Sequence, residues 1–263
     1  MGLEKVLEHS FGLFKKDIRV VLPSVLNLIP SALFSIILLS AIASLEQWMN
    51  IQSLEKVLEN TNLLWQIIKT VLFYVAISIP VFIFMVLISI FLVCVYSDIT
   101  RQSYRRGKIL LIQSFSVAKS RFVPLLWTYF LELLITFLAL GALLVLGLFG
   151  GVVGIILAFL VGIIMIFFFL IFFYETPAVV VLENTSGLEA IRRSYQIGRH
   201  NFLSLLAVIL IVGIILNTVV SGLSAVPYVG IILSNLAMLF LNTWNYMIPN
   251  VFYYEYEKKK EEI

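Results

Sequence analysis

The chain has 263 residues, of which 61% are hydrophobic and 13% are charged, and its formal net charge at pH 7 is +3. Soluble proteins carry about 25% charged residues, so the composition excludes an ordinary soluble domain and indicates a protein embedded in a lipid bilayer. The one cysteine, Cys94, lies in an apolar block. An intramolecular disulfide is therefore excluded, and a buried structural thiol is favoured.

Apolar blocks long enough to cross a bilayer occur six times. A hydrocarbon core of about 30 Å requires about 20 residues of helix. The blocks cover residues 20–45, 65–96, 122–148, 152–174, 203–224 and 229–252. The first is too long for the apolar core of a signal peptide and has no suitable cleavage site, so we expect it to remain as a span. Because backbone groups in lipid need partners within their own segment, and no alternating strand pattern is present, we predict an all-α polytopic protein with six transmembrane helices.

Lysine and arginine are distributed unequally between the two sides of these spans. Sixteen of the 18 lie on the side that carries both termini, and only Lys56 and Lys69 lie on the other. Positive residues are retained on the cytoplasmic side of a membrane. We therefore expect a multi-pass protein of the cell membrane with both termini in the cytoplasm.

One short motif occurs three times, at residues 10–15, 114–119 and 194–199. It reads serine, aromatic, any residue, aliphatic, any residue, basic, and a hydrophobic run follows each copy. Apolar side chains at helical spacing precede each copy, which predicts an amphipathic helix at the membrane interface. We predict a single transmembrane domain, 1–263, built from three parallel hairpin repeats at about 3–100, 108–182 and 187–257, each starting with such an interfacial helix.

The outer connections differ in length. Residues 46–64 have apolar side chains at spacings of three and four, which predicts a short amphipathic helix on the outer surface. The other two connections are tight. Gly147, Gly150, Gly151 and Gly154 surround one of them, and their spacing suits either a tight turn or helix dimerisation, of which we favour the turn.

Glu132 is the carboxylate that lies deep inside a predicted span. An acid in the membrane is costly unless it is paired or protonated, so it marks a functional site by default. One hypothesis is a coupling site for protons or cations that faces Asn217, Asn235 or Asn242. The alternative is a protonated acid that forms hydrogen bonds between helices and serves packing only.

The cytoplasmic side carries a positive collar that suits anionic lipid head groups. The residues that we expect to contact them are Lys15, Lys119, Arg121, Arg192, Arg193 and Arg199. Membrane topology alone is the alternative explanation of these charges. Nucleic acid is not expected as a partner, because no long basic stripe lies away from the membrane.

Each predicted even-numbered span ends in tyrosine next to a carboxylate. The three exits contain Tyr96 with Asp98, Tyr174 with Glu175, and residues 253–255. Aromatic residues anchor helices at the membrane interface, and we interpret these exits in that way.

Residues 172–183, FFYETPAVVVLE, are followed by residues 187–195, GLEAIRRSY, and then by Asn201 and Phe202. This pattern resembles a group of prokaryotic multi-pass proteins, the YciC-like proteins and the membrane domain found beside some glycerophosphodiester phosphodiesterases. The resemblance implies a multi-pass fold of largely uncharacterised role. It does not imply the phosphodiesterase activity, because no part of this chain could supply the metal-binding carboxylates of that soluble barrel.

Motifs for catalysis, metals and cofactors are not found. His9 and His200 lie in unrelated surroundings, and neither metal-ligand spacings nor a phosphate-binding loop occur. We therefore expect no enzyme activity, no metal and no cofactor. The function predicted is interaction with membrane lipids, or scaffolding of a protein partner at the cytoplasmic face; the alternative is a small-solute or ion transporter that uses Glu132.

Overall fold

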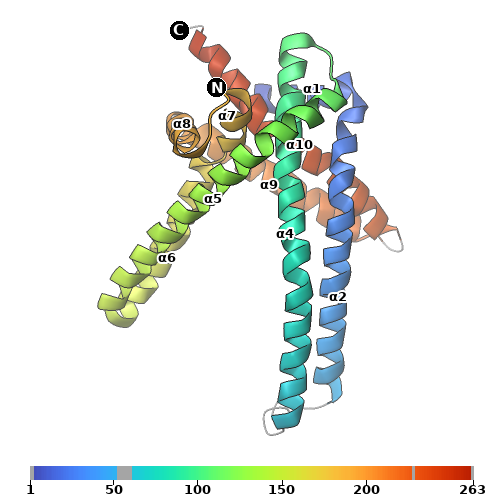
Figure 1. Ribbon diagram of the computed structural model, residues 1–263, viewed down its shortest axis with the longest axis vertical. Helices are drawn as coiled ribbons and strands as arrows, with labels where there is room; N and C mark the ends of the chain where they lie inside the picture. Colours follow the sequence, from blue (N-terminus) through green and yellow to red (C-terminus); the bar gives the residue numbers. More distant parts are fainter. Residues whose placement is uncertain (1–2, 52–60, 227–228, 262–263) are drawn as a thin grey trace. The chain divides into compact units, whose positions relative to one another are not determined.

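The computed structural model describes residues 3–51, 61–226 and 229–261, and every regular element in these ranges is a helix (Figure 1). The expectation of an all-α fold is thus confirmed. The predicted amphipathic helix at 46–64 cannot be followed, because its centre, 52–60, lies outside the described residues. The helices belong to two compact units, Ser24–Ser89, and Met1–Pro23 together with Ile90–Ile263, and each is described by itself.

The unit Ser24–Ser89 is a pair of helices. α2 spans Leu28–Ile51, and the first part of α4, which as a whole spans Thr61–Arg106, runs back beside it (Figure 1). Phe34 and Phe82 pack with their ring centroids 6.1 Å apart, and the hydroxyls of Ser44 and Tyr74 lie 3.0 Å apart. Because lipid tails are as apolar as leucine, aromatic packing and hydrogen bonds of this kind hold such a pair together.

The second unit contains the remaining helices. It consists of the end of α4 with α1 (Leu3–Lys16), α5 (Leu111–Phe149), α6 (Gly151–Phe172), α7 (Thr176–Leu182), α8 (Gly187–His200), α9 (Phe202–Ser224) and α10 (Gly230–Glu261). Between α1 and α2 lies a 3-10 helix, η1 (Ile18–Asn27), which contains Pro23. The proline ring fixes the backbone and removes a hydrogen-bond donor, which is compatible with this tighter helix.

Five helical segments are long and apolar enough to cross a membrane. They are Ile18–Glu46, Leu64–Arg106, Leu111–Phe149, Gly151–Leu182 and Phe202–Ser224, and they overlap the first five predicted spans. The sixth predicted span forms the first part of α10, which is not among these candidates. Asn235, Asn242, Asn245 and Asn250 lie along α10 and lower its hydropathy.

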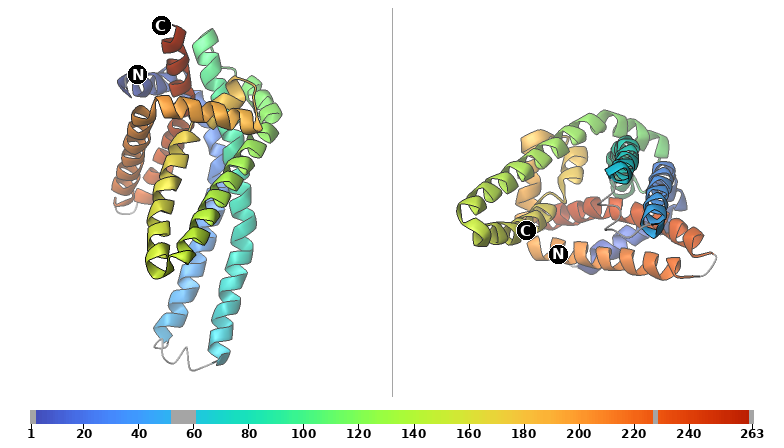
Figure 2. Two further views of the ribbon diagram at one scale, coloured as in Figure 1. Left: turned by 90° about the vertical axis from the view of Figure 1, so that its left-hand side faces the viewer. Right: turned by 90° about the horizontal axis from the view of Figure 1, so that it is seen from below.

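The three predicted interfacial segments differ in form. α1 and α8 are separate helices, and Figure 2 shows α8 running across the end of α6. The segment from residue 111 onward is instead continuous with the span in α5, so it is not a separate helix. α1 and α8 also each place a partly exposed aromatic ring against a neighbouring helix: Phe11 stacks on Trp244 of α10 at 4.6 Å, and Tyr195 packs on Phe172 of α6 at 4.9 Å.

The serine of each motif copy is fully buried and bonded to another helix. Ser10 accepts a hydrogen bond from the indole N–H of Trp244 at 2.8 Å, which joins α1 to α10. Ser114 accepts one from Gln102 at 3.0 Å, which joins α5 to α4. Ser194 donates to the carbonyl of Phe172 at 2.7 Å, which joins α8 to α6. The motif therefore marks helix contacts rather than exposed polar positions.

Candidate functional site: a cavity beside Glu132

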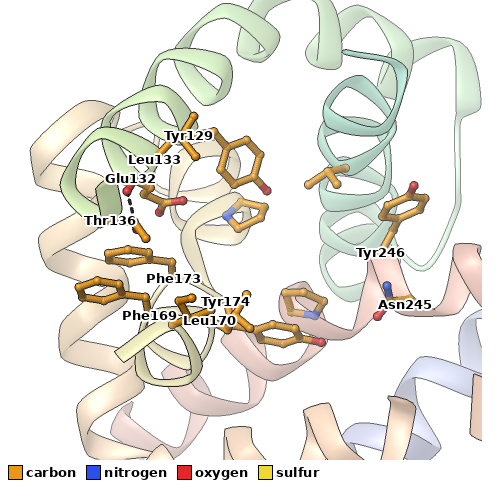
Figure 3. A pocket seen from close by; sticks show the side chains of 14 residues that line it. Tyr129, Glu132, Leu133, Thr136, Phe169, Leu170, Phe173, Tyr174, Asn245 and Tyr246 are labelled. Carbon is orange, nitrogen blue, oxygen red and sulfur yellow. Dashed lines mark hydrogen bonds between the residues drawn. The ribbon is translucent and has the colours of Figure 1, made fainter. Parts of the chain in front are cut away.

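A cavity of about 480 Å³ lies among α5, α6, α7, α10 and the end of α4 (Figure 3). Its size is typical of pockets that hold small molecules. The lining residues are Val93, Tyr129, Glu132, Leu133, Thr136, Ile166, Phe169, Leu170, Phe173, Tyr174, Pro177, Asn245, Tyr246 and Pro249. Most of the wall is therefore aromatic or aliphatic, with a few polar groups.

Glu132 supplies the carboxylate of this wall. It lies on α5 and is only 7% exposed. One carboxylate oxygen, Oε1, accepts a short hydrogen bond from the hydroxyl of Thr176, the first residue of α7. The following residue, Pro177, stands in the first turn of α7, where the missing N–H of proline costs nothing. In the described parts of the chain the other carboxylate oxygen has no hydrogen-bond partner, so it is available to a ligand.

The aromatic side of the cavity comes mainly from α6. Phe169 and Phe173 stack with centroids 5.4 Å apart and nearly parallel planes, and Leu170 lies between them in sequence (Figure 3). Tyr129 enters from α5, one turn before Glu132. A carboxylate combined with aromatic faces suits a ligand with an amine or hydroxyl group, because cations are attracted to ring faces and donors pair with the free oxygen.

α10 forms the opposite wall with Asn245, Tyr246 and Pro249 (Figure 3). Tyr246 stacks on Tyr96 of α4 with ring centroids 5.6 Å apart. The hydroxyl of Tyr96 lies 3.1 Å from the hydroxyl of Thr243, also on α10. These contacts fix the ring that faces the cavity. The arrangement can hold an amphipathic molecule with its polar end near Glu132.

The asparagines that we expected to face Glu132 are not among the lining residues. Asn217 donates to the carbonyl of Gly213 in its own helix at 3.2 Å, and its side chain is exposed. Asn235 and Asn242 lie on α10 but outside the cavity wall, where Asn245 stands instead. Two of the three predicted asparagines share α10 with Asn245, whereas Asn217 lies on α9; which face of α10 meets Glu132 depends on the rotation of that helix.

The predicted collar residues have unequal surroundings. Lys15, Lys119, Arg192 and Arg199 are exposed, and Arg121 is half-buried. Arg193 differs, because its guanidinium donates to Glu183 at 2.9 Å and to Glu257 at 2.7 Å.

The ion pairs of Arg193 with Glu183 and Glu257 therefore have a structural role, because they join α8 to neighbouring parts of the fold. Burial alone would lower its pKa, but the hydrogen bond to Glu183 and the charges of Glu183 and Glu257 raise that pKa above its usual value. Tyr253 of α10 also donates to Glu183, at 2.8 Å, and burial together with this bond raises the pKa of Tyr253. These contacts hold the end of α10 next to α8 and the end of α7.

The carboxylates of the three tyrosine exits are buried, which the interpretation as interfacial anchors did not anticipate. Asp98 pairs with Arg101 and accepts from Gln102 at 2.6 Å. Glu255 lies 2.8 Å from His9 and accepts from Tyr104 at 3.2 Å. Both oxygens of Glu175 are enclosed without a hydrogen-bond partner in the described residues. The short spacing between tyrosine and acid at each exit was the sequence feature from which these buried carboxylates could have been predicted.

Residues 3–51, 61–226 and 229–261 contain no group of three or more histidine, cysteine, aspartate or glutamate side chains that could hold a metal ion. Cys94 is buried and free.

A family model described as a domain of unknown function (DUF7847) matches residues 53–244. Neither the curated proteins nor the solved structures include a match to this chain.

Proposed function

The chain belongs to the family of the domain of unknown function DUF7847, which carries no assigned activity, and on that premise we propose that it is a non-enzymatic membrane protein that binds a lipid-like amphiphile. The ligand site is the cavity beside Glu132. An apolar chain would pack on Phe169, Leu170 and Phe173, and an amine or hydroxyl group would pair with the carboxylate.

One observation carries this proposal: a single carboxylate with a free oxygen stands in a wall that is otherwise mainly aromatic and aliphatic. A hydrophilic solute would leave most of this wall without matching polar groups. An amphiphile satisfies both parts, because its chain removes apolar surface from water and its polar end supplies the donor that the acid lacks.

The proposal includes a topology of six spans, with α10 as the sixth and both termini in the cytoplasm. The distribution of lysine and arginine supports it. So does the position of α1 and the end of α10, which lie at the same end of their unit as α8 (Figure 2). The polar residues of α10 can be accepted in a membrane where they face neighbouring helices rather than lipid.

We further propose that the motif segments of the three repeats are linked in a cyclic series within the second unit. The motif serine of each repeat is bonded to the helix that carries the even span of the repeat before it: Ser114 to Gln102 of α4, Ser194 to Phe172 of α6, and Ser10 of the first repeat to Trp244 of α10 in the last. Such a closed series is what a pseudo-threefold axis would produce. A relation to the YciC-like proteins, supported by residues 172–183, stays part of this proposal.

The exposed basic residues would hold anionic head groups at the cytoplasmic face. Lys15, Lys119, Arg192 and Arg199 are free to do so, and Arg121 is partly accessible. Arg193 is less suited, because Glu183 and Glu257 already use its guanidinium. The same face is available for scaffolding a protein partner.

Native mass spectrometry of protein extracted in mild detergent tests ligand binding. Leu170→Trp should fill the cavity and remove the co-purified amphiphile. Leu160→Trp is the matched control, because Leu160 lies on the same helix with similar exposure, 52% against 59%, but does not line the cavity. Equal retention of the bound mass by both variants would contradict the proposal.

The second candidate function is transport of a small solute or ion. It is favoured by the same free carboxylate oxygen, because a membrane acid that lines a cavity can bind and release a proton or cation. Glu132→Gln keeps the acceptor for Thr176 and removes the charge. In proteoliposomes a transporter would show an ion-linked uptake that this variant abolishes, whereas an amphiphile-binding protein would show no flux above empty vesicles.

A further inference from the structure

A second cavity, of about 220 Å³, lies at the turn between α4 and α5, apart from the cavity beside Glu132. Its lining residues are Arg101, Gln102, Arg105, Arg106 and Gln113. α4 ends at Arg106, Gly107 adopts a positive φ of 65°, and α5 begins at Leu111. Glycine takes up this left-handed conformation without strain, which lets the chain reverse and brings Gln113 next to the arginines.

A buried hydrogen-bond network fixes the wall of this cavity. Gln102 is 4% exposed, and its amide nitrogen donates to Asp98 at 2.6 Å and to Ser114 at 3.0 Å. Its amide oxygen accepts from the backbone N–H of Leu110 at 2.7 Å. The last turn of α4 and the first turn of α5 are thereby joined, so the side chains around the cavity start from a fixed frame.

The charges in the wall are not balanced. Arg101 is paired with Asp98, whereas no carboxylate in the described ranges forms an ion pair with Arg105 or Arg106. Arg106 donates to the amide oxygen of Gln113 at 3.3 Å, a neutral partner. Two guanidinium charges therefore remain uncompensated around a small polar cavity. Gln113 also stands in the first turn of a long helix, whose free N–H groups favour anions.

We propose that this cavity binds a phosphate group through Arg105 and Arg106, with Arg101 and Gln102 as the fixed wall. Guanidinium groups present several donors in a plane and pair with phosphate oxygens through two bonds each, and two uncompensated charges match a phosphate dianion. The cavity has less than half the volume of the one beside Glu132, so it holds the phosphate group itself and not a large molecule around it. The phosphate is carried either by a lipid head group or by a free anion. This site does not depend on the proposed amphiphile.

Two measurements on the purified full-length protein distinguish the sources. Calorimetric titration with inorganic phosphate, with sulfate in parallel, detects a free anion. Native mass spectrometry from nanodiscs of phosphatidic acid mixed with phosphatidylcholine detects a lipid head group. The test variant is Arg105→Gln with Arg106→Gln. Its control is Lys258→Gln with Lys259→Gln, which removes the same charge from exposed positions at the end of α10.

The test variant should lose about tenfold or more in phosphate affinity or phosphatidic acid retention, whereas the control should keep its binding within about twofold. Loss in the titration assigns a free phosphate, and loss in the nanodisc assay assigns a lipid head group. Arg105→Lys with Arg106→Lys keeps the charge but not the planar donors, and should bind at an intermediate level. Equal loss in the test and control variants, or no binding in either assay, would overturn the site.

Discussion

At the scale of single residues, the surroundings of Glu132 and Glu175 distinguish two buried acids. Glu132 has a partner in Thr176 and lines a cavity from which a ligand can reach it. Glu175 is fully buried, and neither of its oxygens has a hydrogen-bond partner in the described residues. A buried polar group without a partner costs about 1–3 kcal/mol of stability. Glu132 is therefore the better candidate for function. Burial of Glu175 lowers the stability of the protein, and no hydrogen bond in the described residues offsets that loss.

Replacing Glu175 with methionine should stabilise the protein. The change keeps a long flexible side chain and removes the unpartnered carboxyl group, so we expect a gain of about 1–3 kcal/mol and a rise of several degrees in the unfolding midpoint. Thermal unfolding in detergent measures it. Glu189→Met, at an exposed position of α8, should change the midpoint little. A clear loss of stability in Glu175→Met would mean that the carboxyl group has a partner, such as a bound ion or water.

At the scale of elements, the hairpin of α5 and α6 is closed by glycines. A Cβ added to Gly147 would lie 2.6 Å from the Cβ of Ala158 and 2.9 Å from the carbonyl oxygen of Gly154. A Cβ added to Gly154 would collide with the carbonyl oxygen of Gly147. Contact this close between backbones requires glycine on both helices. The tight turn that the sequence favoured is present, with α5 ending at Phe149 and α6 beginning at Gly151.

Gly154→Ala should force α5 and α6 apart and destabilise the protein by about 1–3 kcal/mol, as overpacking does elsewhere. The matched control, Gly141→Ala, should instead increase the stability of the protein. Gly141 lies within α5 with nothing within 4 Å of its added Cβ, so alanine there raises helix propensity by about 1 kcal/mol. Thermal unfolding of both variants provides the measurement. The close contact would be unimportant if Gly154→Ala were as stable as the unchanged protein.

At the scale of the whole molecule, the three motif serines test the proposed repeat arrangement. Each removal of a hydroxyl should cost about 0.5–1.5 kcal/mol, because a buried group loses its hydrogen bond. Ser10→Ala, Ser114→Ala and Ser194→Ala should have similar effects, and these should add in the triple variant since the three bonds share no partner.

Denaturation curves of the single and triple variants measure these effects. Ser116→Ala, at an exposed position of α5, should have an effect near zero and serves as the control. If one of the three serines proved silent while the other two were costly, the three contacts would not be equivalent and the cyclic arrangement would lose its support.

The sequence by itself was enough to predict that the protein lies in a lipid bilayer and that its secondary structure is helical. An apolar content of 61% cannot be accommodated by a soluble domain, and long apolar runs in lipid must form helices because their backbone groups have no other partners. These properties depend on composition and on contacts within one segment. The sequence also identified Glu132 as the residue of interest, since an acid in an apolar run is conspicuous without any knowledge of its neighbours.

Only the tertiary structure decided which side chains surround Glu132. Thr176 and Asn245 come from distant helices, and Asn235 and Asn242 were equally plausible until the rotation of α10 was known. The tertiary structure also decided that Arg193, unlike the other five predicted collar residues, forms ion pairs with Glu183 and Glu257. It likewise decided that the arginines at the end of α4 line a common cavity. The pairing of helices depends on side-chain packing between segments, and apolar sequences of similar composition carry little information about which faces will meet.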